Sequence, residues 1–225
     1  MHPRALAAPP RGLWPALAWV ALAALATLGG CTTLSPVAGT AVDWAARDAH
    51  VAALADWQAR GRIAIKSEGA GGQGDLSWRQ AGADARIRVS GPFGAGAWEI
   101  RWDPQGVVVT SRNGQSRQEW RGPEAAEAFL GEQLGWPFPA SSTRWWLLGL
   151  ADPALPASRE FSPRGELVRL EQGGWTVSYQ RYEDAAGIEM PARLTLEGAH
   201  ARLRVVIDRW CLDADCLGDA PAAAD

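Results

Sequence analysis

Histidine and cysteine, two residue types that often serve in catalytic and metal sites, are scarce: the 225 residues contain three of each. His50 falls in a predicted helix and His200 at a predicted turn, and neither has the spacing of a metal ligand. The G-x-S-x-G, H-E-x-x-H and G-K-[ST] motifs do not occur in the sequence. We therefore expect no catalytic site, no metal ion and no cofactor, and we predict that the protein is not an enzyme.

A basic stripe is also missing, which argues against a nucleic-acid partner. The formal net charge is −3, and it becomes −5 without residues 1–30, which hold two arginines and no acidic residue. Residues 69–74 (Gly-Ala-Gly-Gly-Gln-Gly) match the G-x-G-x-x-G pattern. A predicted strand at residues 76–79 follows, however, where a dinucleotide-binding loop requires a helix. Nucleotide binding is therefore not expected.

The first 30 residues have the order of a secretory signal peptide. Arg4 and Arg11 form a basic region, residues 13–28 are almost purely apolar, and two glycines follow. The apolar run is short for a transmembrane helix, although a single N-terminal anchor helix is the alternative. Cleavage after residue 30 would leave a chain of about 195 residues, which fits one domain with a sizeable core.

Leu28-Gly29-Gly30-Cys31 resembles the lipobox of bacterial lipoproteins. The resemblance implies that Cys31 is acylated and becomes the new N-terminus. Several acyl chains are needed for a stable anchor, because one chain binds a membrane only marginally. Thr32 stands where lipoproteins kept in the inner membrane often carry Asp, so the resemblance favours sorting to the outer membrane.

The remaining chain divides into three parts. Residues 31–42 are small and interrupted by Pro and Gly, which predicts a flexible linker from the acylated cysteine. Residues 43–210 carry the regular patterns of a folded domain, and residues 211–225 form an acidic, Ala-rich tail. Cys211 and Cys216 could form a local disulfide in an oxidising compartment, or the tail could be dispensable.

Alternation of polar and apolar residues predicts that the domain is rich in β-strands. The pattern is clearest at residues 84–89 and 97–102, and Asn113-Gly114 is a strong hairpin-turn signal. Residues 68–74 are interpreted as a Gly-rich turn. Further strands are expected at residues 62–66, 76–79, 106–110, 116–120, 166–171, 175–182, 192–197 and 201–208.

Three helices are expected, at residues 43–60, 122–135 and 142–150. Asp43 can cap the first helix, Gly135 can end the second, and residues 152–163 are interpreted as a loop. Short connections between about 10–11 strands favour an antiparallel sheet, which would curl rather than stay flat. The predicted fold class is α+β: an unclosed, strongly curved antiparallel β-barrel with about three helices covering its mouth.

The loop Ser90-Gly91-Pro92-Phe93-Gly94-Ala95-Gly96 joins the two clearest strands and carries no charged or amide side chain. Hairpin tips are usually polar because they meet water. Phe93 therefore either folds back into the core or presents an aromatic tip to something apolar. The residues alone leave both interpretations open.

Several segments occur in the order found in one known family. Besides Cys31, they are Gly61-Arg62-Ile63-Ala64, Leu76-Ser77-Trp78-Arg79-Gln80, Ser90-Gly91-Pro92-Phe93-Gly94, Trp145-Trp146-Leu147-Leu148-Gly149-Leu150, Gly173-Gly174-Trp175-Thr176-Val177-Ser178-Tyr179, Met190-Pro191-Ala192-Arg193-Leu194 and Val206-Ile207-Asp208-Arg209-Trp210. Residues 43–210 thereby resemble the LolB family of outer-membrane lipoproteins. Phe93 departs from the aliphatic residue usual at its position, and the tail after Trp210 is longer than expected.

The resemblance implies an unclosed antiparallel barrel, covered by helices, with an apolar cavity for acyl chains. It implies a monomer, anchored by lipid to the periplasmic face of the outer membrane. Such a protein would take lipoproteins from a LolA-like periplasmic carrier and insert them into that membrane. The loop residues Gly91, Pro92, Phe93 and Gly94 would be the membrane-insertion loop.

Alternation and apolarity indicate which side chains could line an acyl-chain cavity. They are Trp78, Trp98, Ile100, Trp102, Trp145, Trp146, Trp175, Val177 and Tyr179. Tryptophan suits a site for apolar ligands, but it suits an ordinary core equally well. The alternative function is therefore a structural or scaffolding outer-membrane lipoprotein whose barrel is filled by its own side chains.

Overall fold

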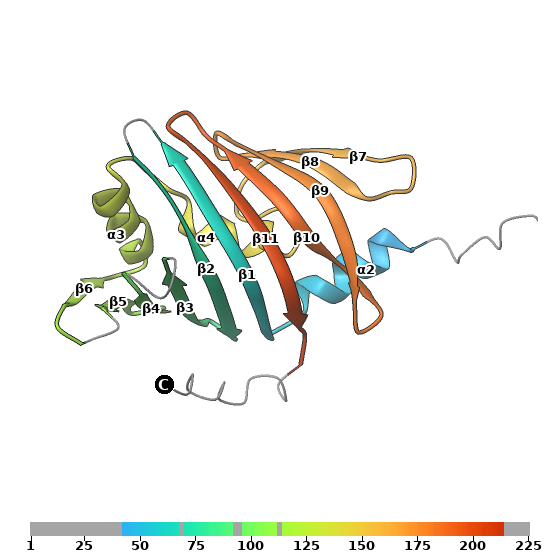
Figure 1. Ribbon diagram of the computed structural model, residues 1–225. Coiled ribbons are helices and arrows are strands. Elements are labelled where there is room, and N and C mark those ends of the chain that lie inside the picture. The colour runs from blue at the N-terminus through green and yellow to red at the C-terminus, as the bar shows by residue number, and fades with distance from the viewer. Residues whose placement is uncertain (1–41, 68–69, 92–95, 112–113, 214–225) are drawn as a thin grey trace, which may run out of the picture. The chain divides into compact units, whose positions relative to one another are not determined.

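The computed structural model describes residues 42–67, 70–91, 96–111 and 114–213 (Figure 1). Within them, eleven strands form one sheet in the order β6-β5-β4-β3-β2-β1-β11-β10-β9-β8-β7, each strand antiparallel to its neighbours. The strands are β1 (Asp56–Ser67), β2 (Ala70–Ala81), β3 (Asp84–Ser90), β4 (Trp98–Asp103), β5 (Gly106–Ser111), β6 (Arg117–Arg121), β7 (Ala157–Phe161), β8 (Leu167–Gln172), β9 (Trp175–Ala185), β10 (Ile188–Glu197) and β11 (Ala201–Cys211). The sheet curls but does not close, which confirms the predicted fold class.

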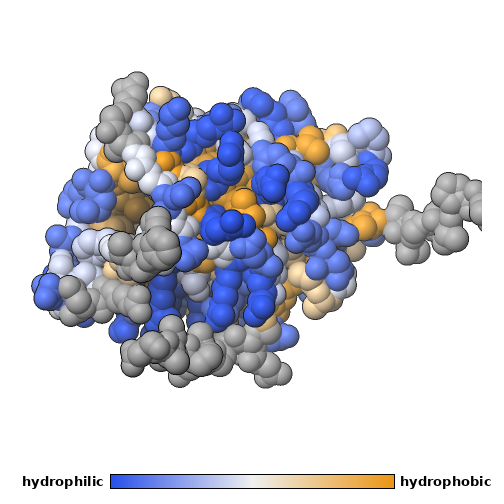
Figure 2. All heavy atoms as spheres, viewed as in Figure 1, coloured by the Kyte–Doolittle hydropathy of each residue, from blue (hydrophilic) through white to orange (hydrophobic). Residues whose placement is uncertain are grey.

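Three helices accompany the sheet: α2 (Trp44–Ala52), α3 (Ala125–Leu134) and α4 (Ala140–Leu147). Helix α4 lies on one face of the sheet, and α3 contacts β5, β6 and α4 (Figure 1). We call the face that carries α4 the inner face and the opposite one the outer face. Hydrophilic side chains predominate on the outer face (Figure 2). The described residues from Val42 onwards form a compact unit with its own core.

Strand β11 illustrates how the sequence produces the two faces. Leu203, Val205 and Ile207 are buried, whereas Arg202 and Arg204, which alternate with them, are exposed. Because successive side chains of a strand point to opposite faces, this alternation places an apolar row inside and a basic row outside. The prediction of alternating strands is confirmed here.

The pairing of β1 with β11 contains a β-bulge between Arg60 and Gly61. Gly61 lies so close to the neighbouring strand that a Cβ atom there would be 1.9 Å from the carbonyl oxygen of Val206. A glycine inside a strand often marks such a close approach of two backbones. This position therefore requires a residue without a side chain.

Helix α2 is attached to the sheet through the buried side chain of Arg47. Its Nε donates to the carbonyl oxygen of Glu189 at 2.8 Å, and an Nη donates to that of Leu148, directly after α4, at 2.7 Å. The guanidinium also lies over the rings of Trp44 and Tyr182, at 5.9 and 5.8 Å from their centroids. A buried charge is stable only with such partners. Arg47 thus ties α2 to β10 and to the end of α4.

The predicted helix at residues 43–60 is too long. Asp43 does cap α2, since its Oδ1 accepts a hydrogen bond from the backbone N–H of Ala46 at 3.0 Å. The helix ends at Ala52, and residues 56–60 belong to β1. Trp57 is buried there and stacks on Trp78 at a centroid distance of 5.9 Å. Tertiary packing of this ring therefore overrides the helical pattern.

Two predicted loops are also wrong in part. The Gly-rich residues 70–75 belong to β2, because β1 extends beside them as far as Ser67. Strand β7 lies within the predicted loop of residues 152–163, where all five of its residues are exposed and give no burial pattern. The predicted end of the second helix at Gly135, in the left-handed conformation with φ 77°, is confirmed.

Candidate functional site

The inner face consists of two parts that differ in how well they are covered. Under α4, the inward side chains of β8 to β11 are completely buried, as at Leu170, Val177 and Leu194. On β1, β3 and β4, by contrast, six apolar inward side chains stay half-buried or exposed, although others on β1 to β3, such as Trp57, Leu76 and Ala85, are buried. We call this second group the apolar strip: Ile63, Ile65, Ile87, Val89, Trp98 and Ile100.

Strand register places four members of the apolar strip side by side on β3 and β4. Val89 is opposite Trp98, and Ile87 is opposite Ile100. Residues directly opposite in an antiparallel pair point to the same face. Trp98 is the most accessible member, with 42% of its surface exposed. On β3 and β4 the strip therefore presents a contiguous apolar surface on the inner face.

Glycines keep part of this surface free of side chains. On β2, Gly72 is opposite Ile65 and Gly74 is opposite Ile63. A Cβ atom at Gly72 would meet no other atom within 4 Å, so the space over this position is open. At Gly74, by contrast, a Cβ atom would lie 2.1 Å from the carbonyl oxygen of Ser90, so the open space is the one at Gly72, beside Ile65. Its chemistry suits a hydrocarbon chain, which needs apolar contact and no hydrogen bonds.

Five of the predicted lining residues form the packed core instead of an open surface: Trp78, Trp146, Trp175, Val177 and Tyr179. Trp146 is fully buried, and its Nε1 donates to Oε1 of Gln172 at 2.9 Å. The hydroxyl of Tyr179 donates to the carbonyl oxygen of Trp146 at 2.9 Å. These contacts fix α4 to β8 and β9. A ligand chain could reach these rings only if α4 moved.

The other four predicted lining residues, Trp98, Ile100, Trp102 and Trp145, keep exposed surface. Trp98 and Ile100 belong to the apolar strip. Trp102 is opposite Ala85 and Val107, near the far end of β4. Trp145 lies on α4, where the guanidinium of Arg144 is 4.7 Å from its ring centroid. The structure thus divides the predicted set between core and surface.

Four members of the apolar strip are absent from the predicted lining set: Ile63, Ile65, Ile87 and Val89. Their alternation was visible in the sequence, but the prediction favoured tryptophan as the lining residue. The glycines opposite Ile63 and Ile65 were a second signal, which the interpretation of residues 68–74 as a turn concealed. Aliphatic residues facing glycines on a neighbouring strand are therefore the better indicator here.

Two buried tyrosines serve as fixed hydrogen-bond donors beside the core. Burial raises the pKa of the Tyr179 hydroxyl well above its usual range, and it also raises the pKa of the Tyr182 hydroxyl. Both groups therefore stay protonated at neutral pH. Tyr182 donates to the carbonyl oxygen of Leu167 at 3.0 Å. Both hydroxyls thus bind backbone carbonyl oxygens of neighbouring elements.

An arginine cluster occupies the outer face of β3 and β4. Glu99 accepts hydrogen bonds from Arg88 at 2.9 Å and from Arg101 at 2.7 Å, and Arg86 lies 3.8 Å away. Desolvation by itself would raise the pKa of Glu99, but hydrogen bonds and the Coulombic attraction of Arg101 and Arg88 lower it on balance. One carboxylate therefore faces three guanidinium groups, and the cluster carries excess positive charge.

The predicted anchor and most of the predicted insertion loop cannot be placed. Cys31, Pro92, Phe93 and Gly94 lie outside the described residues, whereas Gly91 is half-buried at the end of β3. Cys211 is disulfide-bonded, and Cys216 lies outside the described residues. The boundaries of the signal peptide, linker and tail stay predictions.

The described part of the chain contains no group of three or more His, Cys, Asp or Glu residues that could hold a metal ion. Across those same residues, none of the helices is both long and apolar enough to cross a membrane.

The sequence and the fold are similar to those of known proteins. The sequence model of the family described as "Outer membrane lipoprotein LolB" matches residues 55–210. An outer-membrane lipoprotein LolB of Nitrosococcus oceani is 35% identical over 197 residues, covering 86% of this chain and 96% of that protein. One of Stutzerimonas stutzeri is 36% identical over 188 residues, covering 81% and 89%. A LolA superfamily protein from Nitrosomonas europaea has a TM-score of 0.47 at 11% identity, covering 75% of this chain and 89% of that one.

Proposed function

The chain belongs to the LolB family of outer-membrane lipoproteins, and from this premise we propose that it transfers lipoproteins at the outer membrane. It takes them from a LolA-like periplasmic carrier, holds their acyl chains against the apolar strip, and inserts them into the membrane. The observation that supports this proposal is the apolar strip, whose side chains stay half-buried or exposed beside a part of the inner face that is fully buried.

The free energy of acyl chains explains why an apolar surface is needed. Burial of one methylene is worth about 0.8 kcal/mol, so three chains of about 15 methylenes oppose release into water by about 35 kcal/mol. A lipoprotein cannot cross an aqueous compartment unaided against this cost. A receiving surface that binds the chains more tightly than the carrier makes the transfer downhill, without nucleotide hydrolysis.

Binding of a fluorescent fatty acid tests the apolar strip. The protein is prepared as residues 31–225 with Cys31→Ser, so that its own acyl chains do not interfere. We expect the emission of the probe to rise on binding. Trp98→Asp should weaken binding on the order of tenfold, because a charge replaces an exposed apolar contact.

Phe161→Asp is the matched control, since Phe161 is 52% exposed on β7, away from the strip in the strand order. Its probe affinity should equal that of the unaltered chain. Equal affinities for all three proteins would contradict the assignment of the strip.

Phe93→Glu tests the insertion step by itself. A charged tip should not enter a membrane, so we expect acceptance of lipoproteins to persist while their delivery into vesicles is lost. Acceptance and delivery are measured separately, with purified carrier and with vesicles. An unfolded Phe93→Glu variant, detected by circular dichroism, would show that Phe93 belongs to the core.

A second candidate function is that of a structural lipoprotein with a self-filled core. The close packing of Trp146, Trp175 and Tyr179 favours it. It predicts that no acyl probe gains emission in the presence of the unaltered protein, and the first experiment therefore decides between the two functions.

A further inference from the structure

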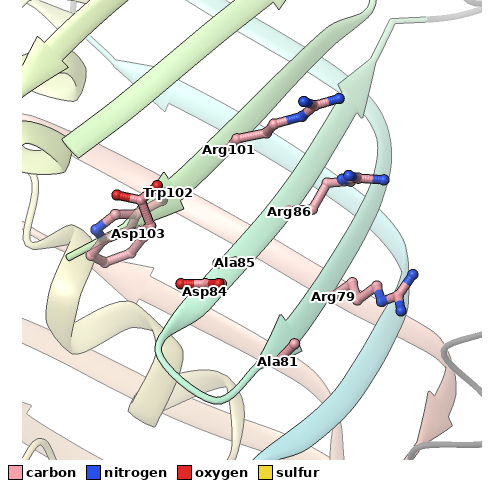
Figure 3. A pocket seen from close by; sticks show the side chains of 8 residues that line it. All are labelled: Arg79, Ala81, Asp84, Ala85, Arg86, Arg101, Trp102 and Asp103. Carbon is pink, nitrogen blue, oxygen red and sulfur yellow. The ribbon is translucent and has the colours of Figure 1, made fainter. Parts of the chain in front are cut away.

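A row of three arginines crosses the outer face of neighbouring strands. Arg79 on β2 is directly opposite Arg86 on β3, and Arg86 is directly opposite Arg101 on β4. Their side chains extend from the sheet in the same direction (Figure 3). We call Arg79, Arg86 and Arg101 the arginine row. Together with Arg88, it forms the most basic part of these three strands.

The charges of the arginine row are only partly compensated. Glu99 is shared by Arg86, Arg88 and Arg101, and within the described residues no ion pair joins Arg79 to a carboxylate. Asp84 and Asp103 line an open hollow of about 320 Å³ together with the row, but they form no ion pair with it in the described chain. Four guanidinium groups therefore face one closely bound carboxylate.

Such an arrangement disfavours folding. Like charges directly opposite on neighbouring strands destabilise a sheet, whereas opposite charges or β-branched residues stabilise it. The chain as a whole has a formal net charge of −3, so the concentration of arginines on these strands does not reflect the overall composition. A partner that supplies negative charge would relieve the repulsion. Arginine is suited to phosphate in particular, because its planar fork donates two parallel hydrogen bonds.

The position of the row favours a membrane over an acidic protein. The basic surface continues on the same face, where an adjoining hollow of about 630 Å³ is lined by Arg88, Arg101 and Arg117. Clusters of basic side chains next to a membrane anchor are typical of surfaces that bind anionic lipid headgroups. Arg86, Arg88 and Arg101 belong to β3 and β4, the strands that flank the predicted insertion loop.

We propose that the arginine row binds the phosphate headgroups of anionic phospholipids and holds the outer face of β2 to β4 against the membrane. This surface binds lipid without any lipoprotein cargo. Binding in this orientation would turn the β3–β4 loop towards the bilayer and so assist delivery of lipoproteins. This second effect rests on the proposed function.

Vesicle co-sedimentation tests the proposal with residues 31–225 carrying Cys31→Ser. One vesicle type contains phosphatidylcholine alone, and the other contains about one third phosphatidylglycerol. We expect binding only to the second type, and we expect it to be lost at about 0.5 M salt because the interaction is electrostatic. The triple variant Arg79→Gln, Arg86→Gln and Arg101→Gln should bind on the order of 100-fold more weakly.

The matched control removes three other exposed or half-exposed arginines: Arg159→Gln, Arg164→Gln and Arg181→Gln. It has the same net charge as the first triple variant, and it should keep the affinity of the unaltered chain. Equal losses in both triple variants would show a general charge effect and overturn the proposal. Equal binding to both vesicle types would overturn it as well.

An acidic protein partner gives a different result. If the arginine-row variant kept its vesicle binding but accepted no lipoprotein from the carrier, the row would face that carrier and the membrane proposal would be wrong. Failure of the proposed function can be told apart from failure of the membrane proposal. The acyl-probe experiment tests the proposed function without vesicles, and the co-sedimentation experiment tests membrane binding without an acyl probe. Circular dichroism of every variant shows that it is folded.

Discussion

Trp146→Ala is expected to lower the free energy of unfolding by about 3–5 kcal/mol, the usual range for removing a buried tryptophan. The ring is fully buried between α4 and the sheet. Its loss would also leave Oε1 of Gln172 without the hydrogen bond that it accepts from Nε1 at 2.9 Å. Urea unfolding followed by circular dichroism measures the change without depending on tryptophan fluorescence.

Trp98→Ala is the control for this experiment, because it removes the same side chain from a position with 42% exposure. Its cost should stay within about 1 kcal/mol. If the two substitutions destabilised the protein equally, the division of the inner face into a packed part and an accessible part would be wrong.

Gly61→Ala should destabilise the protein by about 3 kcal/mol or more, at the upper end of what overpacking costs. The new Cβ atom would lie 1.9 Å from the carbonyl oxygen of Val206 and 2.8 Å from Cα of Ile207. Both are backbone atoms of a central strand and cannot rotate away. Chemical denaturation again gives the magnitude.

Gly72→Ala provides the comparison, since its Cβ would meet no atom within 4 Å. We expect it to change stability by no more than about 1 kcal/mol, in the stabilising direction, because alanine restricts the unfolded chain. A large loss at Gly72, or none at Gly61, would contradict the register of β1 with its two neighbours.

The strands were predicted well from the sequence wherever one face of the sheet is buried and the other is exposed to solvent. On β11, Leu203, Val205 and Ile207 are buried, and Arg202, Arg204 and Asp208 occupy alternate positions that are exposed, which leaves one possible orientation of the strand. The antiparallel order followed from the short connections, and the cap at Asp43 from its position before an apolar stripe. These signals are local, so they can be recognised without knowing the fold.

Signals that depend on distant partners were missed. Gly72 and Gly74 look like turn residues, and only the length of β1 beside them makes them part of a strand. Trp57 continues a helical pattern, but its stacking partner Trp78 comes from another strand. Similarly, apolarity alone could not separate Trp146, whose ring is buried between α4 and the sheet, from Trp98, whose ring stays accessible.

The pairing of β1 with β11 has a consequence for biosynthesis. Strand β1 is synthesised first, and its neighbour β11 is synthesised last. One edge of β1 therefore stays unpaired until residues 201–211 have been made. Exposed strand edges are templates for aggregation, and loops closed over a long stretch of chain form slowly. A nascent or truncated chain that stops before β11 is thus a natural client for periplasmic chaperones and proteases.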